Sequence, residues 1–340
     1  YNIIKSSLSD IFKVLNIIIM KKILFILLIL SVIKIYSQTN SEKINFESAN
    51  PFSFNDVITN LKNQEPQKVF GTLITPFDSL NPSKKYPLII GVAGSLGWKR
   101  HHYEYLEMYQ ESGFATFELN SFKSRSINST VGTQNEITMA AMILDAYKAF
   151  EKLSNHPNID KNRVSLTGWS LGGGVALFSG WLPLKNAINK DLKFASHLAF
   201  YPPCFIEPDN LSFTKSPMHI LIGESDDWTP AYPCVKLVEK LADKANIDIT
   251  VYKDSHHGFD RESPVETNDN GYSFKNCLFK LTNDGDILMN YLHIPMSNPF
   301  LQKIGFLFCT TRGVHIGGNS IARKKSYVFA NDFMMKTLIK

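Results

Sequence analysis

The chain has 340 residues, 44% of them hydrophobic, and a formal net charge of +5, which is enough sequence for one large domain with a substantial core. The first 37 residues hold five lysines and one aspartate, so they account for +4 of that charge and leave +1 for the remainder. With this near-neutral balance nothing in the charge indicates a nucleic-acid-binding protein, which needs a clustered basic face.

The first residues of the chain are organised like a secretory signal. Met20 is followed by two lysines, an apolar run occupies 23–33, and polar residues return around Ser37. A basic start, an apolar stretch of about ten residues and a small residue at the cleavage point are typical of export signals, and the run is shorter than a transmembrane helix requires. We expect translation to start at Met20 and residues 1–37 to be missing from an exported, periplasmic or extracellular protein without stable membrane association. An uncleaved membrane anchor is the alternative.

The rest of the chain alternates between strands and helices. Residues 38–66 are polar and are expected to form a lead-in to a domain over 67–340. Strands are predicted at 69–75, 86–93, 114–119, 164–167, 197–201, 218–223 and 247–252, and helices at 99–111, 135–153, after residue 170, at 233–245 and at 322–337. This alternation predicts an α/β fold with a mostly parallel sheet and helices on both faces.

Residues 261–312 do not follow this alternation. They mix aromatic residues, Asn, Gly, Pro and two cysteines without a clear period. Long non-periodic segments in compact domains are often functional, so one interpretation is an insertion packed near a functional site. Surface decoration held by a disulfide is the alternative.

The segment Gly168-Trp169-Ser170-Leu171-Gly172 lies between the predicted strand at 164–167 and a run of small, helix-compatible residues. A G-x-S-x-G sequence in this strand–turn–helix context is typical of a nucleophile elbow. Small neighbours allow the sharp turn that lifts the Ser170 hydroxyl clear of the sheet. The Leu171 N–H then lies at a helix N-terminus, where it can donate to an oxyanion. We predict that Ser170 is a nucleophile; a structural glycine-rich turn is the alternative.

A serine nucleophile needs a base, and the base needs an orienting carboxylate. Strand 218–223 is followed by Asp226 and Asp227, and strand 247–252 is followed by His256 and His257. Catalytic groups collect beyond the carboxyl ends of strands in open α/β sheets, and the order serine, acid, histidine is that of α/β-hydrolases.

Three motifs in this order resemble the dienelactone hydrolase family of the α/β-hydrolase superfamily. They are Gly-Trp-Ser-Leu-Gly-Gly at 168–173, Gly-Glu-Ser-Asp-Asp-Trp-Thr-Pro at 223–230 and His-Gly-Phe at 257–259. The resemblance runs from about Val69 to the C-terminus and is weakest over 261–312. In the family pattern the acid lies three residues after the strand-end glycine and the histidine directly precedes Gly-Phe, which selects Asp226 and His257.

The resemblance also implies two further site residues. Many relatives carry His-Gly where this chain has Ala93 and Gly94, and matching that loop makes the Ser95 N–H the second oxyanion donor, beside that of Leu171. Arg125 lies in a loop that resembles a Ser-Phe-x-x-Arg-Gly segment of the family and could bind a substrate carboxylate. A salt bridge that holds the loop is the alternative role for Arg125.

These residues predict an exported serine hydrolase that cleaves small carboxylic esters or lactones through an acyl-enzyme, with Ser170, His257 and Asp226 as its triad. Family members that act on dienelactone itself use a cysteine nucleophile, so the serine points to esters more generally. The mechanism needs no metal or organic cofactor. A peptidase of the same superfamily and a non-catalytic binding protein are the alternatives, and the complete ordered triad argues against the second. The sequence does not specify the acyl group, the alcohol group or the oligomeric state.

The four cysteines, all after residue 38, fit an oxidising compartment and lack the spacing of a zinc site. Three pairings are possible. Cys204 follows one predicted strand and Cys234 lies past the turn after the next, and successive strands are usually neighbours. We therefore expect a Cys204–Cys234 bond, which leaves Cys277 to pair with Cys309 inside the insertion.

Overall fold

The computed structural model describes residues 19–22 and 39–339. The chain divides into two compact units, residues 1–38 and residues 39–340, and of the first only a short helical stretch at 19–22 is described. The apolar run and cleavage point of the expected export signal lie outside the described residues. In the described part of the chain, no helix combines the length and apolar character needed to cross a membrane.

The second unit is built on an eight-stranded sheet. Its strands are β1 (Thr39–Ala49), β2 (Pro66–Pro76), β3 (Tyr86–Val92), β4 (Ala115–Leu119), β5 (Ile159–Trp169), β6 (Ser196–Phe200), β8 (Met218–Gly223) and β9 (Ile247–Tyr252). They are arranged in the order β1-β2-β4-β3-β5-β6-β8-β9. All pairs from β4 to β9 are parallel, whereas β1 and β2 are antiparallel to their neighbours. The mostly parallel sheet predicted from the sequence is confirmed.

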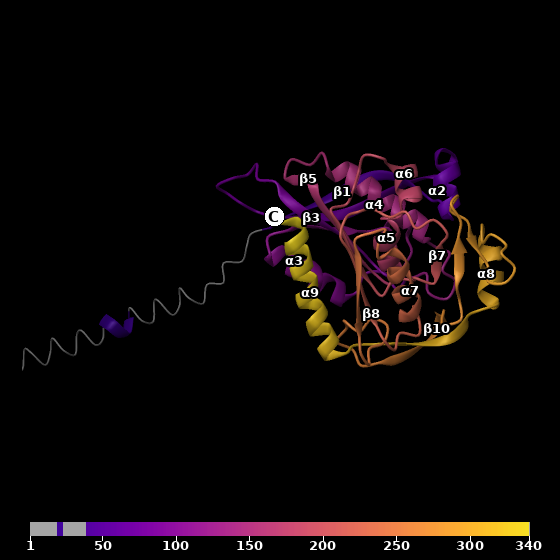
Figure 1. The fold of residues 1–340 in the computed structure, drawn as a ribbon. Helices are drawn as coiled ribbons and strands as arrows, with labels where there is room; N and C mark the ends of the chain where they lie inside the picture. Colours follow the sequence, from indigo (N-terminus) through magenta and orange to yellow (C-terminus); the bar gives the residue numbers. More distant parts are fainter. Residues whose placement is uncertain (1–18, 23–38, 340) are drawn as a thin grey trace, which may run out of the picture. The chain divides into compact units, whose positions relative to one another are not determined.

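Helices cover both faces of this sheet. They are α2 (Phe54–Asn60), α3 (Arg100–Glu111), α4 (Met139–Leu153), α5 (Leu171–Phe178), α6 (Leu182–Ile188), α7 (Ala231–Leu241) and α9 (Ser320–Leu338). Figure 1 shows α3 and α9 side by side on one face, where Tyr105 and Ser326 share a buried hydrogen bond of 2.9 Å, and α4, α5 and α7 on the other. Because both faces are covered, every residue of β3 and β6 is buried, as the continuous apolar sequence of β3 predicts.

The segment 38–66, expected to be a lead-in, is instead part of the domain. β1 pairs with β2 along its whole length, from Thr39 opposite Pro76 to Ala49 opposite Pro66. Helix α2 follows and starts with a capping box. β1 forms the edge of the sheet and most of its residues are exposed, so its composition is polar although it is a regular strand.

The region 261–312 folds into small elements beside the main sheet. β10 (Glu266–Ser273) pairs with β13 (Thr311–Ile316), and β11 (Phe279–Leu281) joins β12 (Ile287–Leu288) and β7 (Ile206–Pro208) in a three-stranded sheet. Helix α8 (Pro299–Leu307) lies between β12 and β13 in the sequence. Both expected disulfides, Cys204–Cys234 and Cys277–Cys309, are confirmed, and the second closes this region on itself.

Candidate active site

Ser170 lies at the turn between β5 and α5. Its backbone has φ 57° and ψ −115°, a sparsely populated conformation that costs roughly 1–3 kcal/mol. Two glycines permit this turn. A Cβ at Gly168 would lie 2.1 Å from the carbonyl oxygen of Gly172, and one at Gly172 would lie 2.2 Å from that of Val92. Since no side chain fits at either position, the surrounding backbone fixes the direction of the serine.

Ser170, His257 and Asp226 form a continuous hydrogen-bonded chain. The Ser170 hydroxyl lies 2.9 Å from Nε2 of His257, and Nδ1 of His257 lies 2.8 Å from Oδ2 of Asp226. The histidine and aspartate side chains are almost completely buried. In this arrangement Nδ1–H donates to the carboxylate, which leaves Nε2 to accept the serine proton.

The turn after β8 holds the carboxylate of Asp226 in place. Oδ1 accepts hydrogen bonds from the backbone N–H groups of Trp228 and Thr229 at 2.9 and 2.8 Å. The Thr229 hydroxyl lies 3.0 Å from the Tyr201 carbonyl oxygen and 3.2 Å from Oδ2 of Asp226. Asp227 makes different contacts, because its two oxygens accept from the backbone and the ring of His315. The geometry therefore separates the two neighbouring aspartates.

Aromatic rings position the imidazole of His257. Tyr201 meets it edge-on with ring centroids 4.6 Å apart, and Trp228 lies against it at 4.9 Å. The Tyr201 hydroxyl donates at 2.8 Å to Asp260, and burial raises the pKa of that carboxyl to about 6. Sequence reasoning missed Tyr201 and Asp260, because nothing in their local sequence indicates that they lie beside the histidine.

The two expected oxyanion donors come from segments that adjoin Ser170. A Cβ at Gly94 would lie 2.9 Å from the Trp169 carbonyl oxygen and 3.2 Å from Cβ of Ser170, so the loop after β3 packs directly on the elbow. Ser95, Leu171 and Ser170 all line one pocket. Among the described residues, neither the Ser95 nor the Leu171 amide donates a hydrogen bond to the protein.

That pocket is a cavity of about 120 Å³ with mostly apolar walls. The region 261–312 supplies five of its large side chains, Phe274, Phe279, Ile287, Met296 and Phe306. No Asp, Glu, Lys, Arg or His is among the residues that line it within the described part of the chain. The region is therefore packed against the site as well as held by a disulfide, so the two interpretations of its sequence are both partly right.

A second, smaller cavity of about 20 Å³ lies on another side of Ser170. Its lining includes Ser95, His257 and Arg261, and its volume suits about one water molecule. Nε of Arg261 is buried and has no hydrogen-bond partner in the described residues. Sequence reasoning did not single out Arg261, although it follows His257 by only four positions.

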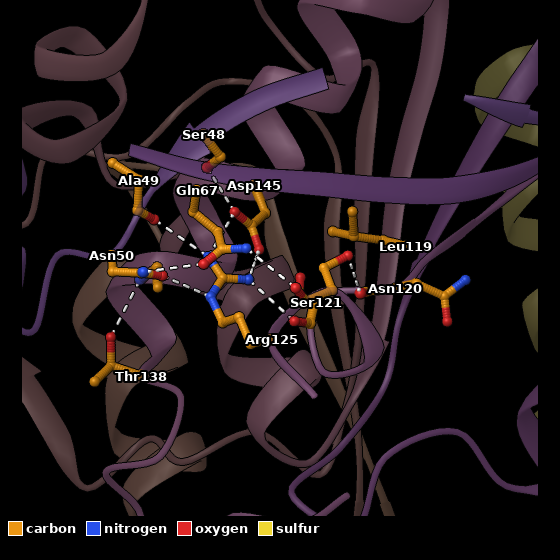
Figure 2. A network of polar contacts seen from close by, with 12 residues as sticks. Ser48, Ala49, Asn50, Gln67, Leu119, Asn120, Ser121, Arg125, Thr138 and Asp145 are labelled. Atoms are coloured by element: carbon orange, nitrogen blue, oxygen red, sulfur yellow. Dashed lines mark hydrogen bonds and ion pairs between the residues drawn. The ribbon is translucent and has the colours of Figure 1, made fainter. Parts of the chain in front are cut away.

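Arg125 lies outside both cavities, in a network of its own (Figure 2). Its guanidinium binds both carboxylate oxygens of Asp145 at 2.7 and 3.1 Å. The remaining donors bind the carbonyl oxygens of Ser121 and Ala49 and the side chain of Asn50. All five N–H groups are thus used within the protein, an arrangement that fits the loop-holding alternative for Arg125 rather than a bond to substrate.

A family model described as "Dienelactone hydrolase family" matches residues 81–276. No curated protein matches the chain.

Among solved structures, a dienelactone hydrolase-like promiscuous phosphotriesterase from metagenomic libraries aligns with a TM-score of 0.51 and 13% identity, over 88% of this chain and 98% of its own. A structure described as m3DLH aligns with a TM-score of 0.52 and 13% identity, over 88% and 99%. At these identities the structures show a shared fold, and the predicted α/β-hydrolase architecture is confirmed.

Proposed function

This chain belongs to the dienelactone hydrolase family and is a carboxylic ester hydrolase, and we propose that it cleaves small, uncharged esters or lactones at Ser170 through an acyl-enzyme. One observation carries the proposal: Ser170, which is hydrogen-bonded to His257 and through it to Asp226, lines the wall of an apolar cavity. A nucleophile, its base and its orienting acid are thus next to a space in which a substrate group fits.

The proposed reaction follows from the contacts of these residues. Nε2 of His257 removes the Ser170 proton as the oxygen attacks the ester carbonyl, and Asp226 stabilises the imidazolium that forms. The Leu171 and Ser95 amides donate to the developing oxyanion, and the loss of one such donor typically costs about 10²–10³ in rate. The protonated histidine then gives its proton to the departing alcohol. Water that enters the 20 Å³ cavity beside His257 can then give a proton to Nε2 and attack the acyl-enzyme, which releases the carboxylic acid and restores Ser170.

The cavity supports a choice of substrate class. An engineered cavity of about 150 Å³ lined by apolar side chains binds benzene, so about 120 Å³ suits one aromatic ring or a short branched chain. A carboxylate placed there would lose its hydration without gaining a cation, because no charged side chain lines the cavity. We therefore propose esters whose buried group is neutral and apolar.

The triad assignment is tested by substitution. Ser170→Ala and His257→Ala should each remove most activity on p-nitrophenyl esters, and the double variant should add little, since the residues act as a unit. Asp227→Asn is the matched control for Asp226→Asn and should cost far less. Near-additive losses, an active Ser170→Ala protein or a reversed order of the two aspartates would contradict the assignment. Covalent labelling by a fluorophosphonate probe, lost in Ser170→Ala, separates an enzyme from a binding protein.

The substrate class is tested with a panel of esters. Phenylacetyl and butyryl esters should have higher kcat/KM than succinyl esters of similar size, because only the last carry a carboxylate. Phe306→Ala enlarges the cavity and should shift the preference towards larger groups. Leu307→Ala, on the exposed side of the same helix, is its control and should leave the preference unchanged. A preference for succinyl esters would refute the proposed class.

We also propose that the protein is exported and that the mature chain starts near Gln38. Two disulfides support an oxidising compartment, and residues 39–340 form a compact unit separate from residues 1–38. Expression in a secreting bacterium should give protein outside the cytoplasm whose N-terminus, read by mass spectrometry, lies near Gln38. An exported, membrane-bound chain that retains Met20 would favour the anchor instead.

A further inference from the structure

Two pairs of identical neighbours, Asp226-Asp227 and His256-His257, follow the ends of β8 and β9, which are adjacent strands of the sheet. Asp226 and His257 belong to the proposed triad. The other two residues, Asp227 and His256, meet His315 from β13. One possible metal-binding atom from each of these three side chains lies within 4.8 Å of the others.

The contacts of this cluster are made at the border between the interior and solvent. The backbone N–H of His315 donates to Oδ1 of Asp227 at 2.9 Å, and the His315 ring nitrogen Nδ1 lies 2.7 Å from Oδ2. The rings of His256 and His315 are 5.4 Å apart between centroids. Nδ1 of His256 is buried and has no hydrogen-bond partner within the described residues. The Asp227 side chain is 11% exposed and that of His315 50%, so an ion can approach from the His315 side.

We propose that Asp227, His256 and His315 form a binding site for a divalent transition-metal ion of the zinc type. Two imidazoles and a carboxylate are ligands that Zn²⁺ uses, with water completing a tetrahedral set. Metal–ligand bonds of about 2.0–2.2 Å place the ligand atoms roughly 3.3–3.5 Å apart. The 2.7 Å Asp227–His315 contact must therefore open by about 0.6–0.8 Å, and a pair at the 4.8 Å limit must close by about 1.3–1.5 Å. Because the His315 ring is half-exposed, it can rotate away from Asp227 to make the first of these changes.

Such an ion would connect three segments that are distant in sequence. It would join the turn that carries Asp226, the turn that carries His257 and strand β13 at the end of the 261–312 region. The ion would stabilise these loops and take no part in ester chemistry, so this inference does not depend on the proposed reaction. The sequence predicts no metal site, because the cysteines lack zinc-site spacing and these three ligands are separated by 29 and 59 positions.

The test is calorimetric titration of untagged, chelator-treated protein with Zn²⁺ alone. We expect one ion per chain and a thermal unfolding midpoint that rises with Zn²⁺ concentration. His315→Ala should weaken Zn²⁺ binding at least 10–100-fold, since the loss of a residue that only hydrogen-bonds a metal ligand already costs about that much. It should also abolish the rise in the unfolding midpoint. His293→Asn is the matched control, an exposed histidine of the same region whose positive φ Asn tolerates, and should bind as the parent does.

A second probe reports the ligands directly. Co²⁺ bound at this site should show visible d–d absorption of a low-symmetry nitrogen and oxygen environment, and His256→Ala and Asp227→Asn should each remove it. Because His315 is half-exposed, His315→Ala gives a folded protein on which to judge the inference even if His256→Ala does not fold. No saturable binding at one ion per chain, or unchanged binding in His315→Ala, would overturn the site.

Discussion

The buried ion pair between Arg125 and Asp145 gives the sharpest test of how the loop beside β4 is held. The perturbation is Asp145→Asn, which keeps the size of the side chain and removes its charge. Asp145 is completely buried and accepts from two guanidinium nitrogens and from the Ser48 hydroxyl at 2.6 Å. The arginine side chain is itself only 6% exposed, so water cannot replace the lost partner.

Breaking a buried ion pair from one side typically costs about 3–5 kcal/mol, because the other charge is left uncompensated. At about 2–3 °C per kcal/mol for a domain of this size, the thermal midpoint should fall by about 6–15 °C. Glu151→Gln is the matched control on the same helix. Its ion pair with Lys148 is about one third exposed on each side, so its loss should cost less than about 1 kcal/mol.

The assay is urea unfolding of a double-mutant cycle, with ester kinetics measured alongside. Arg125→Met combined with Asp145→Leu should cost much less than the sum of the single changes, since two apolar residues leave no buried charge. If Arg125 only holds the loop, KM for neutral esters should stay the same in every variant that folds. A stable Arg125→Met protein with a strongly raised KM would refute this reasoning and restore Arg125 as a substrate ligand.

Three further outcomes are expected. Replacing Cys204 and Cys234 by Ala should lower the free energy of unfolding by roughly 3–4 kcal/mol, the chain-entropy value for a loop of about 30 residues; a loss below 1 kcal/mol would contradict it. Burial raises the pKa of Asp260 from 3.8 to about 6 in the folded protein. The protonated carboxyl therefore stabilises the fold below pH 4 relative to higher pH, and this contribution of about 3 kcal/mol is lost as the pH rises through 6. Between pH 4 and pH 6 the free energy of unfolding of Asp260→Asn should therefore rise relative to that of the parent. A difference between the two proteins that does not change with pH in urea titrations would contradict this expectation. Gly172→Ala should unfold at least 1–3 kcal/mol more easily, because its Cβ would lie 2.2 Å from the Val92 carbonyl, and an unchanged denaturation midpoint would exclude this crowding.

The parts of the fold that sequence predicted are those with local causes. β3 is buried on both faces and reads as an unbroken apolar run, and the elbow needs glycine at two fixed positions around Ser170. β1 was not predicted, because it is an edge strand whose residues mostly face solvent and are therefore polar. It is held by pairing with β2, and its own composition does not indicate that pairing. The sequence placed the 261–312 region near the site as one interpretation, but it did not identify the individual pocket residues, because the aromatic residues of this region have no period.

In the candidate site, too, local motifs predicted some features and distant contacts determine others. A motif ranks Asp226 above Asp227, but the physical distinction is that the amides of Trp228 and Thr229 bind one carboxylate while His315 binds the other. His315 lies 88 positions from Asp227, and no local pattern links them.

The role of Arg125 is also determined by residues that are distant in the sequence. Its loop resembles a substrate-binding segment, yet the residues that determine its role lie elsewhere, in α4 and in the segment that follows β1. A motif specifies which hydrogen-bond donors a position carries, whereas the fold determines which acceptors those donors bind. Within the described residues every N–H of the Arg125 guanidinium has a partner, whereas the buried Nε of Arg261 has none. Of these two arginines it is therefore Arg261, beside Ser170, whose substitution should change the ratio of kcat/KM for charged and neutral esters.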